Sequence, residues 1–120
     1  MDKYAGKTPR KLPPERAIRS YWADRLWAAK GYDSKLEFLE CGTCFACGLD
    51  GNERAHIVAR SIGGSDAVDN LNILCRICHK DSEYIDGERY MSWLLERQPI
   101  DRLMSEAIRG GFNPSAMLLG

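Results

Sequence analysis

The sequence predicts a single α+β domain, and three observations support this fold class. The chain has 120 residues, which is the usual length of one folded unit. Its centre carries two short strand-like segments around a glycine-rich loop, whereas its flanks show apolar residues at helical spacing. Two C-x-x-C pairs bracket that centre, and such pairs are typical ligands of a structural zinc ion. We therefore expect a small zinc-stabilised core between N-terminal and C-terminal helices.

The N-terminal part predicts a basic arm followed by two helices. Residues 1–13 are rich in proline and basic side chains and should form the arm. Pro14 suits the first turn of a helix that runs to about Lys30. Ser34 can cap a second, short helix over residues 35–40. Four apolar residues of the first helix recur at helical spacing and should face the core, namely Ile18, Trp22, Leu26 and Ala29.

The centre of the chain predicts a β–loop–β–α order. Residues 53–58 and 70–74 are the strand candidates, and the Gly/Ser/Asp-rich residues 61–66 form the loop between them. A helix should follow from Arg76 to about Tyr84.

Two further helices should close the domain. The first covers residues 88–97 and ends before Pro99. The second carries a clean apolar stripe, which we interpret as core packing and not as a surface for a partner helix. The stripe consists of Ile100, Leu103, Met104, Ala107 and Ile108. Four parts result: the arm (1–13), a helical N-terminal part (14–40), the zinc-containing core (41–84), and the C-terminal helices and tail (85–120).

The cysteine pattern predicts one tetrahedral zinc site. A C-x-x-C turn presents two sulfurs to one ion, and two such turns complete its coordination. The predicted ligands are Cys44, Cys47, Cys75 and Cys78. Cys41 and Cys44 also have the spacing of a pair, but Gly48 directly after Cys47 allows the tight turn of a knuckle there, so we interpret Cys41 as a spare thiol. With four thiolates bound, no position remains for water, and the zinc should be structural.

Five short motifs lie between residues 44 and 83. They are C-x-x-C-G, Arg54-Ala-His-Ile, Gly63-Gly-Ser-Asp66, Asp69-Asn-Leu and Leu74-Cys-Arg-Ile-Cys-His-Lys80. In combination they resemble the HNH (ββα-metal) endonucleases of the zinc-containing, four-cysteine type, which occur in phages and bacteria. The resemblance implies a small ββα-metal core with a treble-clef-like zinc site. It also implies metal-dependent hydrolysis of DNA phosphodiester bonds to 3′-hydroxyl and 5′-phosphate ends.

The resemblance assigns the roles of three residues. His56 would be the general base, Asn70 would brace the loop that orients it, and His79 would bind the catalytic ion. A histidine suits a base because its ordinary pKa lies near physiological pH. A divalent ion such as Mg²⁺, Mn²⁺ or Ni²⁺ would neutralise charge on the phosphate and the leaving oxygen.

One position departs from the family pattern. Many members carry a metal-binding Asp or His directly before the first histidine, whereas this chain has Ala55. A second ligand would have to come from Glu83, which we favour because it lies one helical turn after His79, or from Glu53 or Asp66. Ala55 also supports an alternative, in which the chain is a non-catalytic zinc module that binds nucleic acid or protein on a degenerate HNH scaffold.

The charge distribution suits a nucleic-acid partner better than the net charge of zero suggests. Residues 1–30 carry eight basic and three acidic side chains, whereas residues 31–90 carry six basic and eleven acidic ones. DNA phosphates should be contacted by Arg54, Arg60 and Arg76 near the site, by Arg16 and Arg19 on the first helix, and by Lys3, Lys7, Arg10 and Lys11 of the arm.

Nothing in the sequence predicts a base-reading module, so specificity or paired cuts would need a second copy or a partner protein of a phage or restriction system. We expect no signal peptide, because the polar, basic N-terminus lacks an apolar stretch, and no membrane span. The expected location is the cytoplasm of a bacterial or phage-infected cell.

Overall fold

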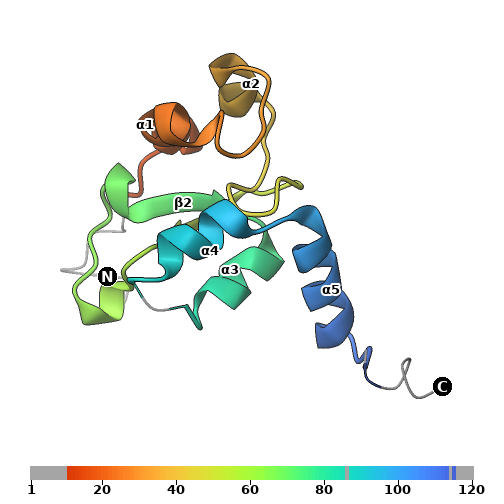
Figure 1. Ribbon diagram of the computed structural model, residues 1–120. Helices are drawn as coiled ribbons and strands as arrows, with labels where there is room; N and C mark the ends of the chain where they lie inside the picture. Colours follow the sequence, from red (N-terminus) through yellow and green to blue (C-terminus); the bar gives the residue numbers. More distant parts are fainter. Residues whose placement is uncertain (1–10, 86, 114, 116–120) are drawn as a thin grey trace, which may run out of the picture.

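The structure, a computed structural model, describes residues 11–85, 87–113 and 115. Seven helices and strands follow one another in these residues (Figure 1). They are α1 (Glu15–Leu26), α2 (Lys35–Glu40), β1 (Glu53–His56), β2 (Leu71–Leu74), α3 (Arg76–Ser82), α4 (Tyr90–Glu96) and α5 (Pro99–Arg109). Two short 3₁₀ turns, Arg60–Ile62 and Val68–Asn70, lie in the connection between the strands. Lys3, Lys7 and Arg10 of the predicted arm lie outside the described residues.

The two strands form an antiparallel hairpin at the centre of the fold. Glu53 pairs with Leu74 and His56 pairs with Leu71, so His56 stands at the end of β1 where the loop begins. Every residue of β2 is buried. Helices α1 and α2 lie on one side of the hairpin, and α3 and α4 lie on the other (Figure 1). The predicted α+β class and the β–loop–β–α order are confirmed.

The core joins α1 to β2. Ile18, Trp22 and Leu26 are buried as predicted, and the indole N–H of Trp22 donates to the carbonyl oxygen of Leu71 at 2.7 Å. The prediction that α1 continues to Lys30 is wrong, because the helix ends at Leu26 and a turn follows. Ala29 lies in that turn and is exposed, so it does not face the core.

The second helix begins as its sequence predicts. The hydroxyl of Ser34 accepts a hydrogen bond from the N–H of Glu37 at 3.1 Å, which satisfies one of the free donors of the first turn. This cap confirms α2 over Lys35–Glu40. The helix matters for the core because its buried Phe38 lies at 5.0 Å, ring centre to ring centre, from Phe45 in the first cysteine turn.

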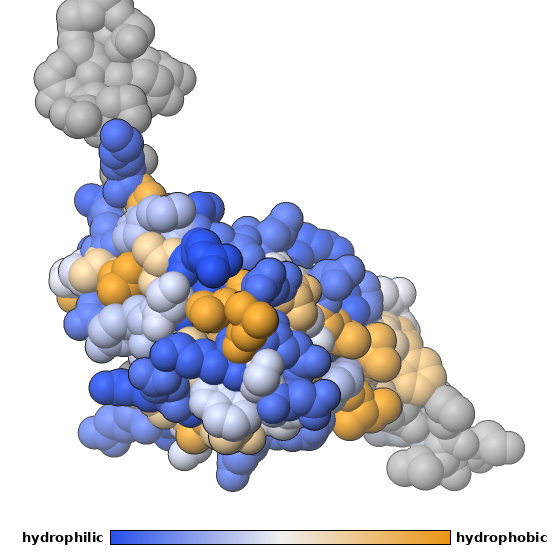
Figure 2. Space-filling view, turned by 90° about the horizontal axis from the view of Figure 1, so that it is seen from above, coloured by the Kyte–Doolittle hydropathy of each residue, from blue (hydrophilic) through white to orange (hydrophobic). Residues whose placement is uncertain are grey.

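Helix α5 is oriented with its apolar stripe toward solvent. None of its residues is buried; Ile100 is 63 % exposed and Ile108 is 48 % exposed. Apolar surface gathers at the end of the molecule where the chain leads to its C-terminus (Figure 2). The prediction that this stripe packs into the core is wrong within the described residues, because the helix contacts Asp81 of α3 through the polar side chains of Ser105 and Arg109.

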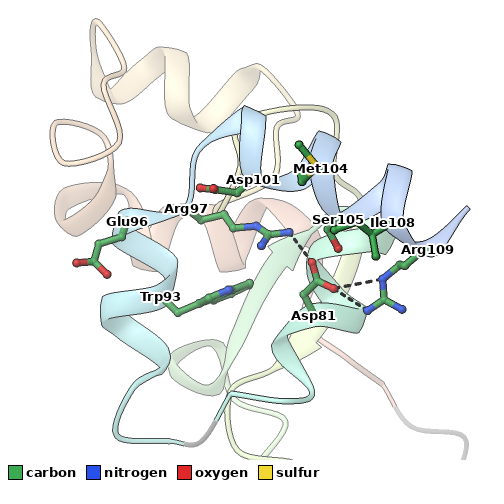
Figure 3. Close-up of a pocket in the computed structure, with 9 residues that line it drawn as sticks. All are labelled: Asp81, Trp93, Glu96, Arg97, Asp101, Met104, Ser105, Ile108 and Arg109. Atoms are coloured by element: carbon green, nitrogen blue, oxygen red, sulfur yellow. Dashed lines mark hydrogen bonds and ion pairs between the residues drawn. The ribbon is translucent and has the colours of Figure 1, made fainter. Parts of the chain in front are cut away.

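An ion-pair network holds α5 in this orientation. The Asp81 carboxylate of α3 accepts from the guanidinium of Arg97 at 2.5 Å and from that of Arg109 at 2.6 Å (Figure 3). Burial alone would raise the pKa of Asp81, but hydrogen bonds from Arg109, Ser105 and Arg97 outweigh it and hold the pKa below its usual value. The three charges line an open cavity of about 540 Å³ between α4 and α5.

Candidate functional site

Four buried cysteine sulfurs form a preorganised metal centre. Their Sγ atoms all lie within 4.8 Å of one another, and those of Cys47 and Cys75 are 3.9 Å apart. With zinc–sulfur bonds of about 2.3 Å, a tetrahedral site has sulfur–sulfur edges of about 3.8 Å. The donor set and its spacing therefore fit zinc, and the predicted ligands Cys44, Cys47, Cys75 and Cys78 are brought together.

Local backbone geometry explains how the two cysteine turns face one ion. The N–H of Leu49 points at the sulfur of Cys47 at 3.5 Å, and Gly48 between them has a φ of 82°, which a glycine adopts without strain. In the second pair, Cys75 caps the N-terminus of α3 and accepts from the N–H of Cys78 at 3.3 Å. Backbone donors thus approach the sulfurs in both turns and stabilise their charge as thiolates.

The sulfur atoms need a cation because they are crowded. The pKa of Cys78 is raised, mainly by its hydrogen bonds to Cys44, Cys47 and Cys75 and to a smaller extent by burial. Deprotonation of Cys78 would add negative charge among the other sulfurs. A bound Zn²⁺ would remove this penalty by attracting every thiolate. Cys41 is exposed and contacts the Thr43 hydroxyl at 3.2 Å, and it is not part of the cluster.

The chain's two histidines line one cavity beside the zinc centre. His56 ends β1, His79 lies in α3 directly after Cys78, and both border a cavity of about 480 Å³. Glu83 caps the C-terminal end of α3 and lines the same cavity. Arg60, from the loop between the strands, lines it as well. The hairpin and α3 therefore bring together residues that are up to 27 positions apart in the sequence.

Each histidine contacts a carboxylate through a different ring nitrogen. Nε2 of His56 lies 2.8 Å from Oδ1 of Asp66. Nδ1 of His79 lies 2.8 Å from Oε1 of Glu53. The sequence suggested Glu53 only as a possible metal ligand and gave no sign of its contact with His79. The two residues are 26 positions apart, and their contact requires the packing of α3 on β1.

Asn70 braces the loop that leads from His56 to Asp66. Its side-chain oxygen accepts from the N–H of Val58 at 2.8 Å. Its amide group donates to the carbonyl oxygens of Val58 at 3.0 Å and of Ser65 at 2.8 Å. Gly64 packs so closely in this loop that a Cβ there would lie 1.7 Å from the Val58 oxygen. Such crowding restricts the loop to one path.

The three residues considered as replacements for a ligand at Ala55 occupy different places. Ala55 itself is buried in β1. Asp66 and Glu53 each contact a histidine ring, whereas Glu83 is exposed at the cavity. Among the described residues, the four cysteines are the one group of three or more potential ligands gathered for an ion. A catalytic ion, in addition to the zinc, would therefore need donors other than the four cysteines, and oxygens of the substrate could be among them.

The arginines predicted to contact DNA differ in their availability. Arg16, Arg60 and Arg76 are exposed. Arg54 is half-buried, and its Nε donates to the carbonyl oxygen of Pro13 at 2.8 Å. The prediction of a phosphate contact at Arg19 is wrong, because this side chain is buried.

Arg19 is a structural residue of the core. Its guanidinium donates to the carbonyl oxygen of Thr43 at 2.6 Å and to that of Phe38 at 3.3 Å, and it pairs with Glu15 at 2.8 Å. These contacts join α1 to the end of α2 and to the chain just before the first cysteine turn. The side chain is 2 % exposed, so no phosphate can reach it without opening the core.

Comparison with known proteins identifies the central segment. Residues 40–84 match the family model described as HNH endonuclease. The matched segment contains the four clustered cysteines, both histidines and Asn70, so the HNH resemblance of this core is confirmed. The search of curated proteins found no match, and neither did the search of solved structures. In the described residues, no helix combines the length and apolar character that crossing a bilayer requires.

Proposed function

We propose that this chain is a metal-dependent endonuclease that hydrolyses DNA phosphodiester bonds to 3′-hydroxyl and 5′-phosphate ends. The observation that carries the proposal is the convergence of His56 and His79 on one cavity within the HNH segment. They are the only two histidines in the chain. A plain zinc-binding module needs neither residue, whereas phosphodiester hydrolysis needs a base and a cation.

His56 is the proposed general base. It stands at the end of β1, where it lines the cavity that would receive the scissile phosphate. The imidazole would take the proton of the attacking water, and the resulting positive charge would lie beside the Asp66 carboxylate at 2.8 Å. A positioned base of this kind contributes about 10²- to 10⁴-fold to the rate.

His79 and Glu83 are the proposed ligands of the catalytic ion. Metal-binding histidines commonly donate their other ring N–H to a carboxylate, and the contact between Nδ1 of His79 and Glu53 provides this arrangement. Two protein ligands suit ions such as Mg²⁺, Mn²⁺ or Ni²⁺ that take further oxygens from substrate and water. When bound, the ion would neutralise charge on the phosphate and the leaving oxygen.

DNA would be held by exposed arginines, one of them at this cavity and the others on the helices. Arg60 lines the cavity itself, Arg76 begins α3, and Arg16 lies on α1. Their contacts with phosphates would supply affinity without reading the sequence. Cleavage of both strands would require a second copy of the chain or a partner protein.

Cleavage of supercoiled plasmid tests the proposal. Wild type and His56→Ala are compared in Mg²⁺, Mn²⁺ and Ni²⁺ at matched zinc content, with Lys35→Ala as an exposed control far from the cavity. We expect metal-dependent nicking or linearisation by the wild type and by the control, and a loss of at least about 100-fold in the His56 variant. Gel-shift assays should show equal DNA binding by all three.

Two results would contradict the proposal. Activity retained by His56→Ala would exclude this residue as the base. A folded, zinc-loaded wild type that is inactive in every metal would favour the alternative of a non-catalytic zinc module on a degenerate HNH scaffold, with Ala55 as the decisive departure.

A further inference from the structure

The two histidines of the cavity present opposite ring nitrogens to their carboxylate partners. His56 uses Nε2 toward Asp66, and His79 uses Nδ1 toward Glu53, each at 2.8 Å. The two carboxylates come from different elements, since Asp66 lies in the loop between the strands and Glu53 begins β1. The two histidines are therefore each in contact with a carboxylate of their own.

An ionised carboxylate accepts hydrogen bonds and donates none. The ring nitrogen in contact with it must therefore carry the hydrogen, and in a neutral imidazole the lone pair then resides on the other nitrogen. We infer that Asp66 and Glu53 hold the two histidines in opposite tautomers, His56 protonated on Nε2 and His79 protonated on Nδ1.

The catalytic meaning of this inference rests on the proposed function. With Nε2 protonated, the basic atom of His56 is Nδ1, and Asp66 stabilises the imidazolium that forms when Nδ1 takes a proton from water. With Nδ1 protonated, the atom of His79 that can bind a metal is Nε2. Asp66 and Glu53 are positioning residues in this scheme, because each acts through a histidine.

The loop geometry shows what keeps Asp66 in place. Asn70 donates to the carbonyl oxygen of Ser65 at 2.8 Å, directly before Asp66 in the chain. Nε of Arg60 lies 3.9 Å from the same Asp66 oxygen that contacts His56. Asn70 therefore orients His56 indirectly, through the Ser65–Asp66 backbone and the Asp66 carboxylate, and not by touching the ring.

Long-range ¹H–¹⁵N spectroscopy of the zinc-loaded chain tests the inference without any need for catalysis. The chain has two histidines, so the spectrum contains two imidazoles, and the His79→Ala variant assigns them. At a pH where both rings are neutral, we expect the Nε2–H form for His56 and the Nδ1–H form for His79. Asp66→Ala should convert His56 to a mixture of tautomers and leave His79 unchanged, and Glu53→Ala should do the reverse.

Activity provides the second measurement. Asp66→Ala should lower kcat by about 10- to 100-fold with little change in KM for DNA, and Asp66→Glu should recover part of the loss. Glu53→Gln should weaken the apparent affinity for the catalytic metal by a similar factor. Ser61→Ala, an exposed side chain of the same loop, is the matched control and should keep both tautomers and the wild-type rate.

The outcomes separate this inference from the proposed function. If His56 already has Nδ1–H in the wild type, or if Asp66→Ala leaves its tautomer unchanged, the inference is overturned whatever the activity. If the tautomers shift as expected in variants of a chain that cleaves no DNA in any metal, the tautomer assignment stands and the nuclease proposal fails.

Discussion

The side chain of Asn70 bonds to both backbone polar groups of Val58, accepting from its N–H at 2.8 Å and donating to its carbonyl oxygen at 3.0 Å. These two hydrogen bonds resemble those between paired residues of an antiparallel hairpin. They lie one position beyond the last backbone hydrogen bond between the strands. Because the strands end at His56 and Leu71, the amide closes the base of the loop where no regular strand pairing remains.

Replacing Asn70 should loosen this loop without unfolding the chain. Asn70→Ala removes three hydrogen bonds, two of them with Val58 and one with Ser65. We expect faster hydrogen exchange in residues 57–69 and a loss of about 1–3 kcal/mol in the free energy of unfolding. Exchange mass spectrometry checks the prediction, and Asn113→Ala serves as an exposed control. Unchanged exchange in the loop would show that Asn70 does not brace it.

Removal of zinc should unfold the core. The four cysteine sulfurs, bound to one ion, would join the first cysteine turn to the start of α3. A chain of this size has a small hydrophobic core, which would not compensate for the loss of the ion. Cys75→Ala, or a strong chelator added to the wild type, should abolish the folded circular-dichroism and NMR signatures. Cys41→Ser should bind one zinc and unfold like the wild type. A marked loss of zinc from Cys41→Ser would show that the ligand assignment is wrong.

Substitution of Arg19 should lower the stability of the fold, whereas substitution of Arg16 should weaken DNA binding. Arg19→Met leaves the carbonyl oxygens of Phe38 and Thr43 without their donor, so we expect a loss of about 3 kcal/mol in stability. Arg16→Gln should leave stability unchanged, weaken DNA binding at every sequence, and lower the salt dependence of log Kd by about one. Denaturant titrations and binding isotherms at several salt concentrations measure the two effects. A destabilised Arg16 variant would contradict this division of roles.

Asp81 should control the docking of α5. The helix buries none of its residues, and the Asp81 carboxylate pairs with Arg97 and Arg109 on either side of the cavity. Asp81→Asn should cost about 2 kcal/mol and make α5 sensitive to protease, while the zinc core stays folded. Arg102→Gln, on the same helix but outside this network, is the matched control. Equal protease resistance in the Asp81 variant would mean that other contacts hold the helix.

The same carboxylate gives a pH dependence of known sign. Because the native pKa of Asp81 is lowered, its stabilising effect is complete above the ordinary value of about 3.9 and is lost as the pH falls through the native value. Acid also protonates the zinc ligands. Comparison of the acid unfolding of wild type and Asp81→Asn therefore isolates the Asp81 contribution: the two curves should converge at low pH.

Sequence reasoning predicted the cluster of four cysteines and the position of His79 beside it, because local spacing determines both. A C-x-x-C turn brings its two sulfurs together whatever the rest of the chain does, and His79 follows Cys78 directly. The hairpin was predictable for the same reason, since alternation and a glycine-rich loop act over a few residues. Helical periodicity likewise identified Ile18, Trp22 and Leu26 as core positions.

The errors arise where tertiary contacts decide. Periodicity treats an arginine as polar, so it could not show that Arg19 meets carbonyl oxygens 19 and 24 residues away. It also identified the apolar stripe of α5 correctly but could not tell which side the Asp81 network would turn toward α3. Sequence reasoning also could not predict the carboxylate partners of the histidines, because each contact requires the folded hairpin or the packing of α3.

Because Cys41 is exposed, thiol labelling can measure the zinc occupancy of the chain. The chain has five cysteines; four sulfurs are buried in the metal cluster, and the fifth is open to reagents. A thiol-reactive dye should therefore label the zinc-loaded chain once and the stripped, unfolded chain five times. Cys41 thus acts as a built-in reporter, and the labelling stoichiometry of a preparation gives its fraction of metal-free molecules before any cleavage is measured.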